Sequence, residues 1–157
     1  MESAPSPINS EGRNYLPITE IDSFDKLDWI CQLGDAENIG SGEYSPLNND
    51  QKDILYTYGA NPCVAGFIQT KDNKRYLFHS IGDQLTPEQK ELISQSKKGF
   101  VGGGKETLKI YDSFFKENNV QVIPQPSPID NNDFNIVIVK KKNLQKKRGI
   151  YYCYAEN

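Results

Sequence analysis

The sequence predicts an α+β domain in which curved mixed or antiparallel β-sheets, arranged like a sandwich, are flanked by helices. Six or more short segments rich in β-branched and aromatic residues are separated by turns, which is typical of strands joined largely as hairpins. Two further segments carry helix signals. We expect a single domain over residues 15–157, because the chain is long enough to bury one core, and a loose arm over residues 1–14.

Strands are predicted where apolar and β-branched residues cluster between turn residues. The predicted strands are residues 54–58, 63–70, 75–81, 120–123, 134–140 and 149–154, with a short strand near Phe100. The segment 71–74, Lys-Asp-Asn-Lys, is the turn of a hairpin between the second and third of them. The last two strands predict a closing hairpin around a basic stretch.

Two helices are predicted in the middle of the chain. Thr86-Pro87-Glu88-Gln89 combines a capping threonine, a proline at the first helical position and a glutamine that completes a capping box. This helix is expected to end at Gly99. The second helix is expected over residues 105–118. Its predicted buried face consists of Leu108, Tyr111 and Phe115.

The first third of the chain gives weaker signals. Residues 15–33 form a mixed segment with a short apolar face, to which Phe24, Leu27, Trp29 and Ile30 are assigned. Residues 34–50 are rich in Gly, Asn and Ser. A loop of this length fits a substrate-facing flap and plain disorder equally well.

Composition excludes several classes of function. A net charge of -3 gives no broad reason to expect nucleic acid or an anionic membrane as a partner. No stretch is long and apolar enough to cross a bilayer, and the first residues lack the basic and apolar segments of a secretory signal. Three widely spaced cysteines argue against a disulfide framework, so we expect a reducing compartment.

The only histidine in the sequence, His79, lies near the end of one predicted strand, and Cys63 opens the strand before it. A hairpin centred near Asp72 and Asn73 places Cys63 roughly opposite residue 82, about three residues from His79. Strands lie about 5 Å apart, so the thiol can reach the imidazole if both side chains project to one face. Taken singly, each residue also fits a structural role in a buried strand.

Together these residues favour nucleophilic catalysis on an amide. A histidine beside a cysteine stabilises the thiolate, which is the reactive species. The thiolate attacks the amide carbon, backbone N–H groups stabilise the oxyanion, and the imidazole transfers protons. Thr57, on the preceding predicted strand, could orient the ring through its hydroxyl, although it also fits an ordinary strand residue.

The segment Thr57-Tyr58-Gly59-Ala60-Asn61-Pro62-Cys63-Val64-Ala65, followed by His79, resembles the chemoreceptor glutamine deamidase (CheD) family. The family shares its fold with the cytotoxic necrotising factor toxins, which deamidate host proteins. Its members carry a threonine six residues before the nucleophilic cysteine and a histidine sixteen to seventeen residues after it. Here the intervals are six and sixteen. The resemblance implies a CheD-like fold and a site of Cys63, His79 and Thr57.

The resemblance covers roughly residues 50 to 156. Phe100-Val101-Gly102-Gly103-Gly104 looks like the family's strand that runs into a Gly-Gly turn. The chain departs from the family before the cysteine, where Asn61-Pro62 replaces Gly-Ser or Ser-Gly, and it lacks the family's Gly-Gly run before the histidine. Because Pro62 has no N–H, the oxyanion donor must be the Cys63 N–H or the Asn61 side-chain amide. These departures favour a divergent deamidase.

Other motifs compete less well. Residues 99–106 nearly fit a phosphate-binding P-loop, but Glu106 stands where a hydroxyl must bind Mg²⁺, so a glycine turn is the better interpretation. One His and three scattered Cys give no structural zinc spacing. The lysines and arginine of residues 140–148 fit a solvated hairpin end better than an anion site.

The resulting prediction is a hydrolase that converts protein glutamine side chains to glutamate. Cys63 is the expected nucleophile, His79 the general acid and base, and Thr57 the orienting group, with no cofactor or metal. We expect a protein partner bearing a reactive glutamine, with location in the bacterial cytoplasm or, as a toxin-like effector, in a host cytosol. The alternatives are a papain-like protease or transglutaminase and an inactive interaction module on the same scaffold. The oligomeric state and the target are left open.

Overall fold

The computed structural model describes residues 16–47, 52–126, 132–141 and 146–156. The predicted arm over residues 1–14 lies outside these ranges. Two five-stranded mixed sheets make up the fold, and we name them sheet A and sheet B. The prediction of an α+β domain with mixed sheets and flanking helices is confirmed.

Sheet A has the strand order β1-β10-β9-β4-β2. Its strands are β1 (Ile18–Glu20), β10 (Gly149–Glu156), β9 (Asn132–Val139), β4 (Ile54–Ala60) and β2 (Ala36–Asn38). Sheet B has the order β3-β6-β5-β7-β8. Its strands are β3 (Tyr44–Pro46), β6 (Arg75–His79), β5 (Val64–Thr70), β7 (Ser96–Gly103) and β8 (Val120–Val122). The edge strands β1, β2 and β8 pair in parallel, and all other pairs are antiparallel.

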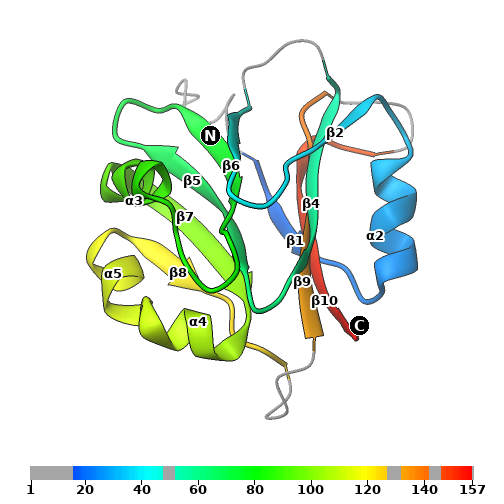
Figure 1. Ribbon diagram of the computed structural model, residues 1–157. Coiled ribbons are helices and arrows are strands. Elements are labelled where there is room, and N and C mark those ends of the chain that lie inside the picture. Colours follow the sequence, from blue (N-terminus) through cyan, green and yellow to red (C-terminus); the bar gives the residue numbers. More distant parts are fainter. Residues whose placement is uncertain (1–15, 48–51, 127–131, 142–145, 157) are drawn as a thin grey trace, which may run out of the picture.

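The two sheets face each other, and helices cover their outer faces (Figure 1). Helix α2 (Phe24–Cys31) packs on sheet A. Helices α3 (Pro87–Ser94), α4 (Lys105–Ile110) and α5 (Asp112–Glu117) pack on sheet B. A separate apolar core fills the space between the sheets. Side chains that alternate along each strand therefore face the inter-sheet core and a helix layer in turn.

Strand β5 is buried along its whole length, because apolar material covers both of its faces. Ala65 and Phe67 point into the inter-sheet core, whereas Val64 and Ile68 point toward the helices. The predicted hairpin with β6 is present, and Asn73 takes a left-handed conformation in its turn. The strands are paired so that Ala65 lies opposite His79, which shifts the predicted register by one residue.

The predicted end of helix α3 at Gly99 is wrong. The helix begins at the predicted capping box, with Thr86 and Gln89 bonded reciprocally, but it ends at Ser94. Residues 96–103 instead form β7 and pair with β5. Gly99 is needed there for close approach, because a Cβ would lie 2.4 Å from the Phe67 carbonyl oxygen. Pairing with β5 thus overrides the local helix signal.

The second predicted helix is interrupted at Tyr111, which separates α4 from α5. The predicted burial of Leu108 and Phe115 is confirmed, and Tyr111 is partly buried beside them. The Tyr111 hydroxyl accepts a hydrogen bond from the Leu85 N–H at 3.1 Å, which ties the break to the loop before α3.

In the first third, the assignment of Trp29 to the apolar face is wrong. Leu27, Ile30 and Cys31 are buried on α2, whereas Trp29 is 52 % exposed. Residues three or four apart share a helix face, and Trp29 falls on the opposite side from Leu27. The described part of the predicted 34–50 loop is ordered by β2 and β3, and residues 48–50 lie outside the description.

Gly66 tests whether the central strand depends on close backbone packing. A Cβ at this position would lie 2.2 Å from the Phe100 carbonyl oxygen on β7. We expect Gly66→Ala to lower the free energy of unfolding by about 2–3 kcal/mol, since the core cannot absorb this overlap. Gly40→Ala is the control, because its Cβ would meet only the Glu43 carboxylate end, at 3.2 Å. Urea unfolding of both variants checks this, and equal stabilities would contradict the packing described.

Candidate active site

Thr57 is aimed into the space between the sheets by the alternation of strand β4. Leu55 and Ala60 share its inward face, although Ala60 comes three positions after Thr57, where strict alternation would require an even number. A β-bulge between Thr57 and Ala60 accounts for the extra residue, and Gly59 has the positive φ of 74° in it. Thr57 is only 1 % exposed, so its hydroxyl must find partners inside the protein.

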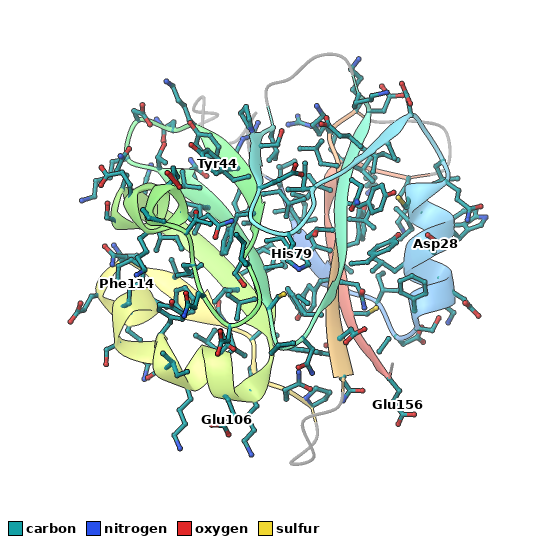
Figure 2. The ribbon with its side chains drawn as sticks, in the orientation of Figure 1. Asp28, Tyr44, His79, Glu106, Phe114 and Glu156 are labelled. Atoms are coloured by element: carbon teal, nitrogen blue, oxygen red, sulfur yellow. The ribbon has the colours of Figure 1, made fainter. Side chains whose placement is uncertain are left out.

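His79, at the end of β6, is the residue of sheet B that meets this hydroxyl. It lies centrally between the two sheets (Figure 2). Its Nδ1 is 2.6 Å from Thr57 Oγ1. Directly across the hairpin is Ala65, whose small side chain leaves room for the ring. The structure therefore brings together two of the three residues that the sequence predicted for the site.

The hydrogen bonds of Thr57 determine which nitrogen of the neutral imidazole carries the proton. Thr57 Oγ1 also lies 2.6 Å from the carbonyl oxygen of Ile39, which can only accept. The single hydroxyl proton is therefore donated to Ile39, and the same oxygen accepts a proton from His79 Nδ1. In the neutral ring this leaves Nε2 without a proton. The imidazole is thus held with its basic nitrogen directed away from Thr57.

Burial lowers the pKa of His79 below its ordinary value of 6.5. The side chain is only 6 % exposed, and removal from water disfavours the charged ring. At neutral pH the imidazole is therefore uncharged, which is the form required of a general base.

The backbone of His79 is fixed on both sides. Its N–H donates to the Glu43 carbonyl at 3.1 Å. Its carbonyl accepts from the Gly42 N–H at 2.7 Å and from Gln89 Nε2 at 2.8 Å. Gln89 is fully buried and also donates to the Glu43 carbonyl. The start of helix α3 and the 40–43 loop thus clamp the strand end that carries the imidazole.

Cys63 immediately precedes β5 and is partly buried. It lies two residues before Ala65 and packs against the same inter-sheet core, so it projects to the same face as His79. The two residues are diagonal neighbours across the hairpin, a relation in which long side chains can touch. Among the described residues, no hydrogen bond joins the Cys63 thiol to the imidazole. The structure thus places both side chains on one face of sheet B without a hydrogen bond between them.

The turn before Cys63 determines which groups can stabilise an oxyanion. The Asn61–Pro62 peptide bond is cis, and the Asn61 side-chain amide donates to the Asn132 carbonyl at 2.9 Å. Of the two donors that the sequence offered, the Asn61 amide is therefore engaged at the start of β9. No described residue accepts a hydrogen bond from the Cys63 N–H. That N–H is the better candidate donor.

The glycine-rich segment lies against this turn. A Cβ at Gly104 would lie 2.8 Å from Pro62 Cα, so only glycine permits the approach. The Gly104 N–H donates to the Cys63 carbonyl at 3.0 Å, and the Gly103 N–H donates to the Tyr154 hydroxyl at 3.0 Å. Two amides that a phosphate loop would present to its ligand are therefore already bonded. The segment supports the Cys63 turn.

The other two thiols lie elsewhere. Cys31 and Cys153 are buried in the apolar layer between sheet A and α2. Burial raises the pKa of Cys31, and it raises that of Cys153 to about 11. Both are poor nucleophiles at neutral pH. Within the described ranges, no three His, Cys, Asp or Glu side chains are grouped as metal ligands.

Several groups at this site had no signal in the sequence. The Ile39 and Glu43 carbonyls come from a segment with no clear pattern, and any residue could supply them. Gln89 was recognised for its capping box alone, which uses its Oε1 and leaves the amide protons for Glu43 and His79. Ser80 follows the histidine and was not singled out.

The fold and the site define an α+β sandwich with a buried Thr–His pair and a partly buried cysteine that packs against the inter-sheet core. No protein-family model matches this chain, and no curated protein matches it significantly. No helix in the described part of the chain has the length and apolar character needed to cross a membrane.

The assignment of the imidazole proton can be measured on the only histidine of the sequence. We expect nitrogen-15 NMR above pH 7 to show the proton on Nδ1, because Thr57 Oγ1 must accept it. Thr57→Val removes the acceptor, and the proton should then move largely to Nε2. A ring protonated on Nε2 in the unaltered protein would contradict the assignment.

The lowered pKa of His79 makes stability depend on pH. Between the folded value and 6.5 the unfolded chain binds more protons than the folded one. This contribution to the free energy of unfolding is full above pH 6.5 and is lost as the pH falls through the folded pKa. Urea unfolding at pH 7.5 and pH 5 should therefore show a smaller loss for His79→Gln than for the unaltered protein. Equal losses of stability in the two proteins would show that burial does not lower the pKa of the His79 ring.

Proposed function

We propose that this protein is a cysteine-dependent protein-glutamine deamidase. The observation that carries the proposal is the hydrogen bond from His79 Nδ1 to Thr57, which leaves a neutral Nε2 free on the face that also bears Cys63. A nucleophile, a base and a group that orients the base are the parts that amide hydrolysis through a thioester requires. The resemblance to the CheD family in the spacing of these residues supports the same activity.

In the first half of the reaction, His79 Nε2 takes the thiol proton and the Cys63 sulfur attacks the carbon of the glutamine amide. A C–S bond forms, and the carbonyl oxygen becomes an oxyanion that the Cys63 N–H can stabilise. The protonated imidazole then gives its proton to the amide nitrogen. The C–N bond breaks, ammonia leaves, and a thioester on Cys63 results.

In the second half, neutral His79 Nε2 accepts a proton from water as the water attacks the thioester carbon. The C–S bond breaks, the proton returns to sulfur, and glutamate is released. The balanced reaction is amide plus water to carboxylate plus ammonium. The Thr57 hydroxyl keeps Nδ1 protonated throughout, so that the same nitrogen, Nε2, handles every proton.

The depth of the site favours a side-chain amide over a peptide bond. His79 is 6 % exposed and lies between the sheets, whereas Cys63 is partly exposed just before the first residue of β5. A glutamine side chain carries its amide at the end of a flexible chain, so this amide can approach a partly buried thiol more readily than a peptide bond of a folded main chain can. Placement also argues against a papain-like protease or transglutaminase, whose nucleophile typically begins a helix, because Cys63 is followed by β5.

One further candidate function has an observation in its favour. The missing Cys63–His79 hydrogen bond and the Pro62 substitution both fit an interaction module that has lost activity on a deamidase-like scaffold. In the proposed enzyme, the partner is a protein bearing a reactive glutamine. The enzyme would act in the bacterial cytoplasm or, as an effector, in the cytosol of a host cell.

Deamidation gives a direct readout of the proposal. We expect incubation with a bacterial and a eukaryotic cell lysate to raise the mass of specific glutamine peptides by about one unit, because a hydroxyl replaces an amino group. The mark should be absent with Cys63→Ala and at least about tenfold weaker with His79→Ala. Cys153→Ala is the control, since it removes a buried thiol under sheet A and should leave the mark. Equal marks with Cys63→Ala and with the unaltered protein would contradict the proposal.

The reactivity of the thiol can be tested without a target. We expect iodoacetamide at pH 7 to alkylate Cys63 before the buried Cys31 and Cys153, as peptide mass spectrometry can show. The rate at Cys63 should fall about tenfold or more in His79→Ala, because the base that takes the thiol proton is lost. An unchanged rate would favour the inactive module.

A further inference from the structure

Beyond His79, the pairing of β5 with β6 changes from backbone to side-chain hydrogen bonds. The Ser80 N–H still donates to the Val64 carbonyl at 2.8 Å, as in a regular ladder. The reciprocal bond is different, since the Val64 N–H donates to Ser80 Oγ at 2.9 Å. The Ser80 carbonyl turns away and accepts from Ser41 Oγ at 3.0 Å and from the Gly42 N–H at 3.3 Å.

The Ser80 hydroxyl is buried and makes hydrogen bonds both as a donor and as an acceptor. It accepts from Val64 and donates to the Gly82 carbonyl at 3.0 Å, and the residue is 0 % exposed. Val64 is also 0 % exposed, so water cannot replace the hydroxyl as an acceptor. Removing the oxygen would leave the Val64 N–H without a partner.

These two residues directly follow the members of the proposed catalytic pair. Val64 is joined to Cys63 and Ser80 to His79, so one side chain links the peptide after the nucleophile to the peptide after the base. The turned carbonyl has a second effect, because it engages the 41–42 loop, and the Gly42 N–H in turn donates to the His79 carbonyl. If the Ser80 carbonyl accepted from the Val64 N–H instead, as in a regular ladder, it would not be available to Ser41 and Gly42.

We propose that Ser80 is a positioning residue that sets the separation between the Cys63 sulfur and the His79 ring. The inference rests on the proposed function, since it concerns the geometry of that same pair. Ser80 acts on the nucleophile side of the site, whereas Thr57 orients the ring from the opposite sheet. Loss of the Ser80 hydroxyl should therefore uncouple Cys63 from His79 while the Thr57–His79 bond is kept.

A double-mutant cycle measures this coupling. The rate at which iodoacetamide alkylates Cys63 is compared with and without His79→Ala, first in the unaltered protein and then in Ser80→Ala. We expect a ratio of about ten or more in the unaltered protein and a ratio near one in Ser80→Ala, because displacement of about 1 Å can remove most of such an effect. Nitrogen-15 NMR of Ser80→Ala should still show the proton on His79 Nδ1, which loss of the fold would not preserve.

Ser96→Ala is the matched control. Ser96 is a buried serine of sheet B that pairs with Thr70 at the far end of β5, and its hydroxyl has no partner among the described residues. Its removal should leave the ratio unchanged. If Ser80→Ala does not fold, Ser80→Cys keeps the size of the side chain with a weak acceptor, and it too should bring the ratio near one.

The outcomes separate the two claims. A ratio near ten that persists in the folded Ser80→Ala or Ser80→Cys protein overturns the role of Ser80 and leaves the deamidase proposal intact. A ratio near one in the unaltered protein contradicts the deamidase proposal itself.

Discussion

The hydrogen bond between Thr57 and His79 is the contact on which the site depends, because it joins the two sheets through two buried polar side chains. Residues 36–46 cross from sheet A to sheet B, pairing first with β4 and then with β6. Within this segment, the Ile39 carbonyl accepts a hydrogen bond from the Thr57 hydroxyl, and the Glu43 carbonyl accepts one from the His79 backbone N–H. One crossing segment thereby determines both the protonation and the position of the imidazole.

The two members of the proposed pair are held by different parts of the fold. The imidazole is held by Thr57 through its ring and by Glu43, Gly42 and Gln89 through its backbone. Cys63 lies just outside the regular part of β5, after a cis proline turn. Catalytic hydrogen bonds are often long before substrate binds. The absence of a Cys63–His79 hydrogen bond is therefore compatible with a thiol that reaches the ring by rotation of its own side chain.

The sequence was sufficient for the parts that local chemistry decides. The 71–74 turn, the capping box at Thr86 and the closing hairpin have recognisable residues at fixed spacing. The strand β7 was missed over residues 96–99, because its pairing with β5 is decided by distant residues and by a glycine that merely permits it. At the site, the histidine, cysteine and threonine could be found from spacing. The Ile39 and Glu43 carbonyls could not, since every residue carries a carbonyl and only the fold selects which ones matter.

If Cys63 attacks a glutamine amide with His79 Nε2 as its base, the reaction must pass through a thioester on Cys63 that forms with loss of ammonia. Acid quenching during turnover of a peptide that contains the target glutamine, followed by intact-mass measurement, tests it most directly. We expect an adduct on Cys63 with the mass of the peptide less one ammonia, which hydroxylamine removes and which Cys63→Ala lacks. Turnover that proceeds with no such adduct, or with an adduct on Cys31 or Cys153, would contradict the account.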